Sequence, residues 1–210
     1  MKSNLLPLVL ALVVLGGCSS EPPKSAEQKP QPAAAPAEPE TVTGRVAFQR
    51  LYVAAHGWAP DARPFRLQSQ TSKSNTGHDG KSGIWRAQFA SAGRRSIKPY
   101  VWSGIKADDA PSPGVNPGSE DTYNPSNTNT QVFDIAFLKV DSDKAYAEAQ
   151  KHGGEKILKK TPDQPVSYML DWRASSNELI WHVYYGTGED DAKLKVAIDA
   201  SSGAFLRIEK

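Results

Sequence analysis

The fold is decided by the stretch Ile180-Trp181-His182-Val183-Tyr184-Tyr185, because a similar string, Ile84-Trp85-Arg86-Ala87-Gln88-Phe89, stands 96 residues earlier. In each string large apolar side chains recur at alternate positions, a pattern typical of a half-buried β-strand. His56-Gly57 and His152-Gly153 are separated by the same 96 residues. Matches that keep one order along the chain predict that the folded part contains one structural unit twice.

The spacing between matching strings falls toward the end of the chain. Ile97-Lys98 corresponds to Leu194-Lys195 at an offset of 97, whereas Ala136-Phe137-Leu138-Lys139-Val140 corresponds to Ala204-Phe205-Leu206-Arg207-Ile208 at 68. The first copy therefore carries roughly 29 additional residues. They coincide with the stretch 104–130, rich in Asp, Pro, Gly, Asn and Ser, which is expected to be a long loop.

Each copy reads as a helix followed by four strands. In the first unit, 44–140, Thr43 can cap a helix that carries Ala47 and Leu51 on one face. In the second unit, 141–210, a helix capped by Ser142 or Asp141 carries Ala145 and Ala149. The predicted fold class is α+β, with two repeated units that each pack a helix on an antiparallel four-stranded sheet.

The first two strands of the second unit form a predicted hairpin. Alignment of their apolar faces sets Trp172 opposite Trp181, with the loop at 175–178. The same register places His182 opposite Asp171 on the outer face of the sheet. An Asp–His pair of this kind is either a cross-strand polar contact or an oriented base.

The closing hairpin is Val196-Ala197-Ile198-Asp199-Ala200-Ser201-Ser202-Gly203-Ala204-Phe205-Leu206. Its hydrophobic-x-hydrophobic-Asp-Ala-x-x-Gly pattern, together with the Ala-rich helix, resembles a PepSY domain. The resemblance is clearest over 140–210, and 44–140 would be a degenerate copy. It implies a role in binding or restraining proteases at the bacterial cell surface.

The apolar run Leu5–Leu15 is followed by Leu15-Gly16-Gly17-Cys18, which resembles the bacterial lipobox. The run is shorter than the roughly 20 apolar residues that cross a bilayer, so residues 1–17 are interpreted as a lipoprotein signal peptide. The resemblance implies lipidation of Cys18, and Ser19 resembles the outer-membrane sorting pattern. We therefore expect an anchor in the outer membrane facing the periplasm; the alternative is an ordinary secretory peptide cut elsewhere.

The stretch 18–43 joins the anchor to the folded part and consists largely of Pro, Ala and Glu. Its main part, Glu21 to Glu40, lacks the large apolar residues needed to offset chain entropy, so the stretch is predicted to be a disordered tether. Residues 44–210 hold 22 basic and 19 acidic residues, spread along the chain. This balance does not indicate a nucleic-acid-binding protein.

The search for reactive groups predicts no catalytic residues, no metal site and no cofactor. The four histidines lack the spacing and the Cys partners of a metal site. His182 has Asp171 as a partner, but no serine stands in a recognisable nucleophile elbow. We therefore do not expect an enzyme, although a hydrolase that uses His182 is kept as a minor hypothesis.

Aromatic residues are the remaining candidates for recognition. Trp102 closes a strand, Tyr123 lies in the long loop, and Tyr184 points outward from its strand. Together they are predicted to form a partner-binding surface, since aromatic side chains are frequent interface anchors. The leading hypothesis is a membrane-anchored module that binds an envelope protein or peptide. The alternatives are a small-molecule or lipid carrier, with its cavity between helix and sheet, and an envelope structural protein.

Overall fold

The computed structural model describes residues 39–72, 75–108, 110–127 and 130–210. The predicted signal peptide 1–17, Cys18 and most of the predicted tether lie outside these residues. Among the residues that are described, no helix has both the length and the hydropathy to span a membrane. The account below concerns the compact unit to which all of them belong.

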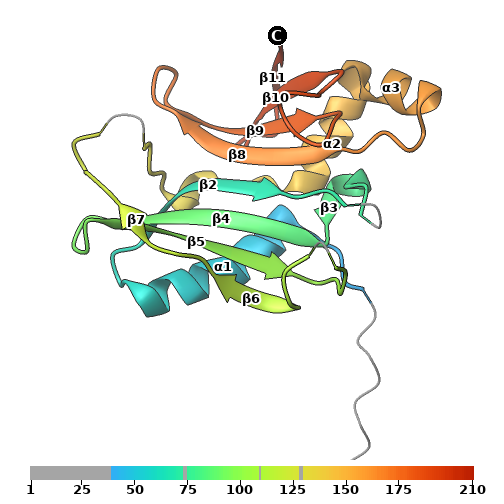
Figure 1. The fold of residues 1–210 in the computed structure, drawn as a ribbon. Coiled ribbons are helices and arrows are strands. Elements are labelled where there is room, and N and C mark those ends of the chain that lie inside the picture. The colour runs from blue at the N-terminus through green and yellow to red at the C-terminus, as the bar shows by residue number, and fades with distance from the viewer. Residues whose placement is uncertain (1–38, 73–74, 109, 128–129) are drawn as a thin grey trace, which may run out of the picture. The chain divides into compact units, whose positions relative to one another are not determined.

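Nine antiparallel strands form one continuous sheet (Figure 1). Its strand order is β11 (Phe205–Glu209), β10 (Lys195–Asp199), β9 (Glu178–Tyr184), β8 (Ser167–Arg173), β2 (Arg63–Ser69), β4 (Ile84–Ser91), β5 (Ser96–Ser103) and β6 (Gly114–Pro117), with β7 (Asp121–Thr122) also paired to β5. A separate pair joins β1 (Val42–Thr43) to β3 (Lys81–Ser82). The fold is thus α+β with a mostly antiparallel sheet.

The expectation of two separate four-stranded sheets is corrected by the pairing of β2 with β8. Arg66 lies opposite Asp171, and Leu67 lies opposite Leu170. Both leucines are fully buried. Pairing these two strands satisfies backbone groups that would otherwise form two unpaired edges in the middle of the molecule.

The two predicted helices begin where the sequence predicts, after Thr43 and Asp141. The helices are α1 (Gly44–Trp58), α2 (Ser142–Ala149) and α3 (Glu155–Lys160), with the π-helical turn η3 (Gln150–Gly154) between the last two and the short 3-10 helices η1 (His78–Gly80) and η2 (Ile135–Phe137) elsewhere. The cap of α2 is Asp141, whose side chain accepts a hydrogen bond from the Ser142 amide at 2.7 Å. Ala145 and Ala149 are fully buried, as the sequence predicts.

The core joins both halves of the chain through two tryptophans. The Trp85 and Trp181 rings are fully buried and meet edge to face at 6.4 Å between centroids. Trp85 Nε1 donates to the Val42 carbonyl at 3.0 Å, and Trp181 Nε1 donates to the Val140 carbonyl at 2.9 Å. Because each valine stands just before a helix cap, each ring ties the start of a helix to the second long strand of its half.

The starts of α1 and α2 also bond directly to each other. The Gly44 amide donates to Ser142 Oγ at 2.7 Å, and Thr43 Oγ1 donates to Asp141 Oδ2 at 2.7 Å. A Cβ at Gly44 would lie 2.6 Å from the Trp181 ring. Glycine is therefore required where the beginning of α1 approaches the core.

The predicted fourth strand of the first half, over 136–140, is wrong. This segment contains η2, and the amides of Lys139 and Val140 donate to the Ala200 carbonyl at 3.1 and 2.8 Å instead of joining a strand. The strands β6 and β7 replace it, and both come from the stretch 104–130 that was predicted to be a loop.

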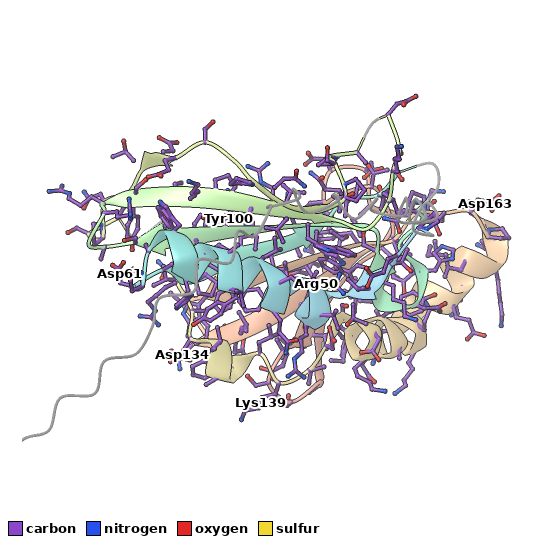
Figure 2. The ribbon with its side chains drawn as sticks, turned by 90° about the horizontal axis from the view of Figure 1, so that it is seen from below. Arg50, Asp61, Tyr100, Asp134, Lys139 and Asp163 are labelled. Carbon is purple, nitrogen blue, oxygen red and sulfur yellow. The ribbon has the colours of Figure 1, made fainter. Side chains whose placement is uncertain are left out.

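The end of the predicted tether belongs to the fold. The Glu40 amide donates to the Gly104 carbonyl at 2.8 Å, and its carboxylate pairs with Arg50 at 2.8 Å. Arg50 in turn stands over the Trp102 ring, 4.8 Å from its centroid. Figure 2 shows Arg50 on α1, which runs alongside β5, the strand that carries Tyr100. The tether predicted over 18–43 therefore ends before Glu40.

Candidate functional site

Among the described residues, the helices α1 and α2 pack on one face of the sheet, and no described helix lies over the other face, called here the open face. Directly opposed residues of an antiparallel pair point to the same side, so Ser167 and Tyr184 share a face with Met169 and His182. On this open face lies a cleft of about 510 Å³. Its lining includes Arg66, Asp171, Arg173, His182, Tyr184 and Glu209.

His182 and Asp171 are in contact, although the hairpin register differs from the prediction. Met169 lies opposite His182, and Asp171 is two residues further along β8. His182 Nε2 nevertheless stands 3.2 Å from Asp171 Oδ1, a diagonal contact across the strands. The hairpin loop is 174–177, with Asn177 at φ 56°, so the predicted loop at 175–178 is shifted by one residue.

Glu209 is a second carboxylate on His182 that the sequence reasoning missed. Glu209 Oε2 lies 2.6 Å from His182 Nδ1, although β10 runs between their strands. The residue of β10 opposite His182 is Ala197, whose methyl group leaves room for the two longer side chains to meet above it. A sequence pattern could not predict this contact, because β9 and β11 are not neighbours in the sheet.

The two carboxylates determine the charge of His182. Burial lowers the pKa of His182, but the hydrogen bonds and charges of Asp171 and Glu209 raise it more, to about 9. Burial raises the pKa of Glu209, but its hydrogen bond with His182 and the charges of His182 and Arg207 lower it more, to about 2. Both groups are therefore ionised at neutral pH.

Three arginines surround the pair of carboxylates. Arg207 contacts Glu209 at 2.6 Å between Nη2 and Oε1, whereas Arg173 stands 3.5 Å from the same oxygen. Arg66 lies 3.7 Å from Asp171 Oδ2. Three guanidinium groups and the imidazolium thus face two carboxylates. The excess of positive charge resides on Arg66 and Arg173, whose side chains are both 44% exposed.

This arrangement is suited to recognition rather than to proton abstraction. An imidazolium that donates both N–H groups to carboxylates has no lone pair with which to accept a proton. The exposed guanidinium groups keep donors available for an anionic group in the cleft. Among the described residues, no group of three or more His, Cys, Asp and Glu side chains is arranged to hold a metal ion.

The three aromatics predicted to bind a partner are all buried. Trp102, Tyr184 and Tyr123 are 3%, 4% and 8% exposed. Trp102 belongs to the core below Arg50, and the Tyr123 amide is bound to the Arg95 carbonyl at 2.9 Å. Their expected exposure is therefore wrong. Tyr184 lines the cleft, where its ring stacks on His182 at 6.0 Å between centroids, and its role in binding stays a prediction.

A smaller apolar hollow of about 140 Å³ lies on the helix side of the molecule. It is lined by Phe48 and Tyr52 of α1 and by Ile135 and Leu138 of the segment that contains η2. In Figure 2 this segment, between the labelled Asp134 and Lys139, borders α1 on the side away from Tyr100. Its small volume and its lack of charged side chains other than Arg45 make it a weaker candidate than the cleft.

Comparison with known proteins supports the fold. No protein-family model matches the chain, and no curated protein matches it. A crystal structure of a protein described as "a putative lipoprotein" from Clostridium difficile 630 superposes with a TM-score of 0.53 at 10% identity. The alignment covers 78% of this chain and 91% of that chain. At this identity the similarity concerns the fold alone.

Proposed function

We propose that this chain is an exported lipoprotein whose folded part binds an envelope protein or peptide on the open face of the sheet. The observation that carries this proposal is the cleft of about 510 Å³ on the open face of the sheet, over which no helix of the described residues lies. Its exposed arginines and its aromatic residues Trp172 and Tyr184 are residue types that are enriched at protein interfaces. The proposal uses this face in place of the buried Trp102 and Tyr123.

The anchor in this proposal is Cys18, supported by the sequence Leu15-Gly16-Gly17-Cys18. Attachment to the outer membrane, facing the periplasm, is the corresponding proposed location. Mass spectrometry of the protein from a bacterial host tests the anchor directly. A diacylglyceryl group on Cys18 is expected, and a Cys18→Ser variant should leave the membrane fraction. An unmodified Cys18 in the exported protein would contradict the proposal.

We also propose that the two halves are copies of one unit, similar to PepSY domains. Three features support the duplication. The helix starts at Gly44 and Ser142 are 98 residues apart, Trp85 and Trp181 make equivalent hydrogen bonds, and α1 and α2 each precede a series of antiparallel strands. The PepSY resemblance itself rests on the sequence, namely the Ala-rich helix, the strand pair with an aromatic core and the closing hairpin Val196–Leu206.

The carrier alternative requires an apolar cavity between helix and sheet. That space is occupied by fully buried side chains that include Trp85, Phe89, Tyr168, Trp181 and Tyr185. Burial at this density is typical of a packed protein interior. The structure therefore offers no observation in favour of a carrier, and binding on the open face is preferred.

Site-specific photocrosslinking in the native host tests the proposed function. A photoreactive residue at Gln68 borders the hollows of the open face, whereas one at Val53 of α1 is 73% exposed on the opposite side. We expect a discrete crosslinked protein or peptide from position 68 and none from position 53. The same products from both positions, or none from either, would contradict binding on this face.

A further inference from the structure

Ser167 has a buried hydroxyl that the fold leaves unused. Its side chain is 3% exposed, and within the described residues its Oγ has no hydrogen-bond partner. It points to the open face opposite Tyr184, where it lines a hollow of about 210 Å³. Buried hydroxyl groups in folded proteins normally make a hydrogen bond, so the Ser167 hydroxyl at the wall of this hollow can still bond a group that enters the hollow.

The Ser167 hollow is continuous with the cleft around His182. Met169, Tyr184 and Glu189 line both. The walls near Ser167 are mostly uncharged and offer hydrogen bonds, for example from Gln68 and Thr187. The two hollows therefore form one groove with a neutral polar end and a charged end.

The charged end carries excess positive charge. Glu209 already accepts from His182 and Arg207 at 2.6 Å each, so Arg173 at 3.5 Å is only loosely held. Arg66 is held even more loosely, at 3.7 Å from Asp171. On the other wall Glu189 stands 3.9 Å from Lys195, which offsets its charge.

We infer that this groove binds the free carboxylate end of a peptide, with the carboxylate at Arg66 and Arg173 and the preceding residues beside Ser167. The inference rests on the proposed function and names its ligand class. A guanidinium group binds a carboxylate through two parallel N–H donors, and with the described residues neither Arg66 nor Arg173 makes such a pair. The Ser167 hydroxyl then donates to a peptide carbonyl, or accepts from a peptide amide, of the bound segment.

Two acetylated tripeptides of alanine serve as probes, one with a free carboxylate and one with a carboxamide end. Saturation-transfer NMR on the full chain in detergent micelles measures the binding of each. The carboxylate peptide is expected to bind roughly tenfold more tightly than the amide, equivalent to the loss of one charged interaction. Equal binding of both peptides, or binding of neither at millimolar concentration, would overturn the inference.

Three variants locate the site. Arg66→Gln and Arg173→Gln should each weaken the carboxylate peptide roughly tenfold. Arg86→Gln is the matched control. Arg86 of β4 lies directly opposite Gln68 of β2, so it shares the open face of the sheet, but it does not line the cleft. An Arg86→Gln variant that lost as much affinity as the other two would show a general charge effect and overturn the assignment.

Ser167→Ala separates binding from folding. The hydroxyl makes no hydrogen bond with any residue that the structure describes, so its removal should leave the melting temperature unchanged or raised and should weaken peptide binding several-fold. Unchanged affinity would remove Ser167 from the site. If the photoreactive residue at Gln68 still captures a partner while both peptides bind equally, the carboxylate inference fails and the proposed function stands.

Discussion

The protein should become less stable as the pH rises, because His182 then loses the proton that its two carboxylate partners stabilise. Its pKa of about 9 in the folded protein lies above the ordinary value of 6.5 that applies to the unfolded chain. A raised pKa contributes stability that is fully present below pH 6.5 and is lost as the pH rises through about 9. The difference corresponds to about 3 kcal/mol of unfolding free energy.

Urea unfolding of the purified protein at pH 6 and at pH 9.5 measures this loss. The control is His182→Gln, which keeps an N–H donor but cannot titrate, so the other histidines and the lysines affect both proteins alike. We expect the free energy of unfolding to fall by about 3 kcal/mol more in the natural protein than in the variant. Equal decreases in the two proteins would refute the reasoning.

An NMR titration of the imidazole provides an independent reading. The Cε1 proton of His182 should titrate with a midpoint near 9. In Glu209→Gln the midpoint should fall, because one of the two carboxylates that favour the charged ring is removed. A midpoint near 6.5 in the natural protein would show that the carboxylates do not hold the proton on the ring.

Three further predictions concern packing and hydrogen bonds, and each is checked by thermal or urea unfolding. Ala197→Leu should destabilise the protein by about 1–3 kcal/mol, because the larger side chain occupies the space above β10 where His182 meets Glu209. Loss of that contact should also lower the pKa of His182. A variant of unchanged stability with an unchanged His182 titration would contradict this geometry. Gly44→Ala should destabilise the protein by about 1–3 kcal/mol, because the added methyl group contacts the Trp181 ring. Gly57→Ala in the same helix has open space around it and should stabilise the protein by up to about 1 kcal/mol. Changes of the same sign in both variants would count against the role assigned to Gly44. Trp85→Phe should cost about 1 kcal/mol for the lost bond to the Val42 carbonyl in addition to the cavity it leaves, and a neutral effect would contradict it.

The sequence predicts local elements well because their signals are local. The cap at Asp141 and the spacing of Ala145 and Ala149 suffice to place α2. Alternation along β9 correctly places Trp181 and Val183 in the core. These assignments depend on neighbours three or four positions away and need no knowledge of distant strands.

The hairpin register shows where such reasoning stops. Trp172 lies opposite Leu179 rather than Trp181, a shift of two residues from the prediction. A shift of two keeps every side chain on its own face, so apolar alternation cannot distinguish the two registers. Contact between His182 and Asp171 was nevertheless correctly anticipated, because a side chain can reach its diagonal neighbour as well as the residue directly opposite.

Contacts between strands far apart in the chain could not be predicted. The pairing of β2 with β8 merges two expected sheets into one, and Glu209 reaches His182 across β10. Internal similarity also misled the assignment of 136–140, since its apolar string matches that of β11 but it lies against the turn at Ala200. Which strands pair, and where an apolar segment packs, depends on contacts between residues far apart in the chain, and a local pattern does not contain that information.

The central position of the β2–β8 pair has a consequence for biosynthesis. The two strands meet only after roughly 100 intervening residues have emerged, and closing so long a loop is slow. Until then one edge of β2, the strand that contains the apolar Leu67, has no partner strand. An unpaired strand edge can pair with another chain, which leads to aggregation. If the chain is exported unfolded, as the proposed function implies, the interval between the arrival of β2 and that of β8 is when it most needs a chaperone.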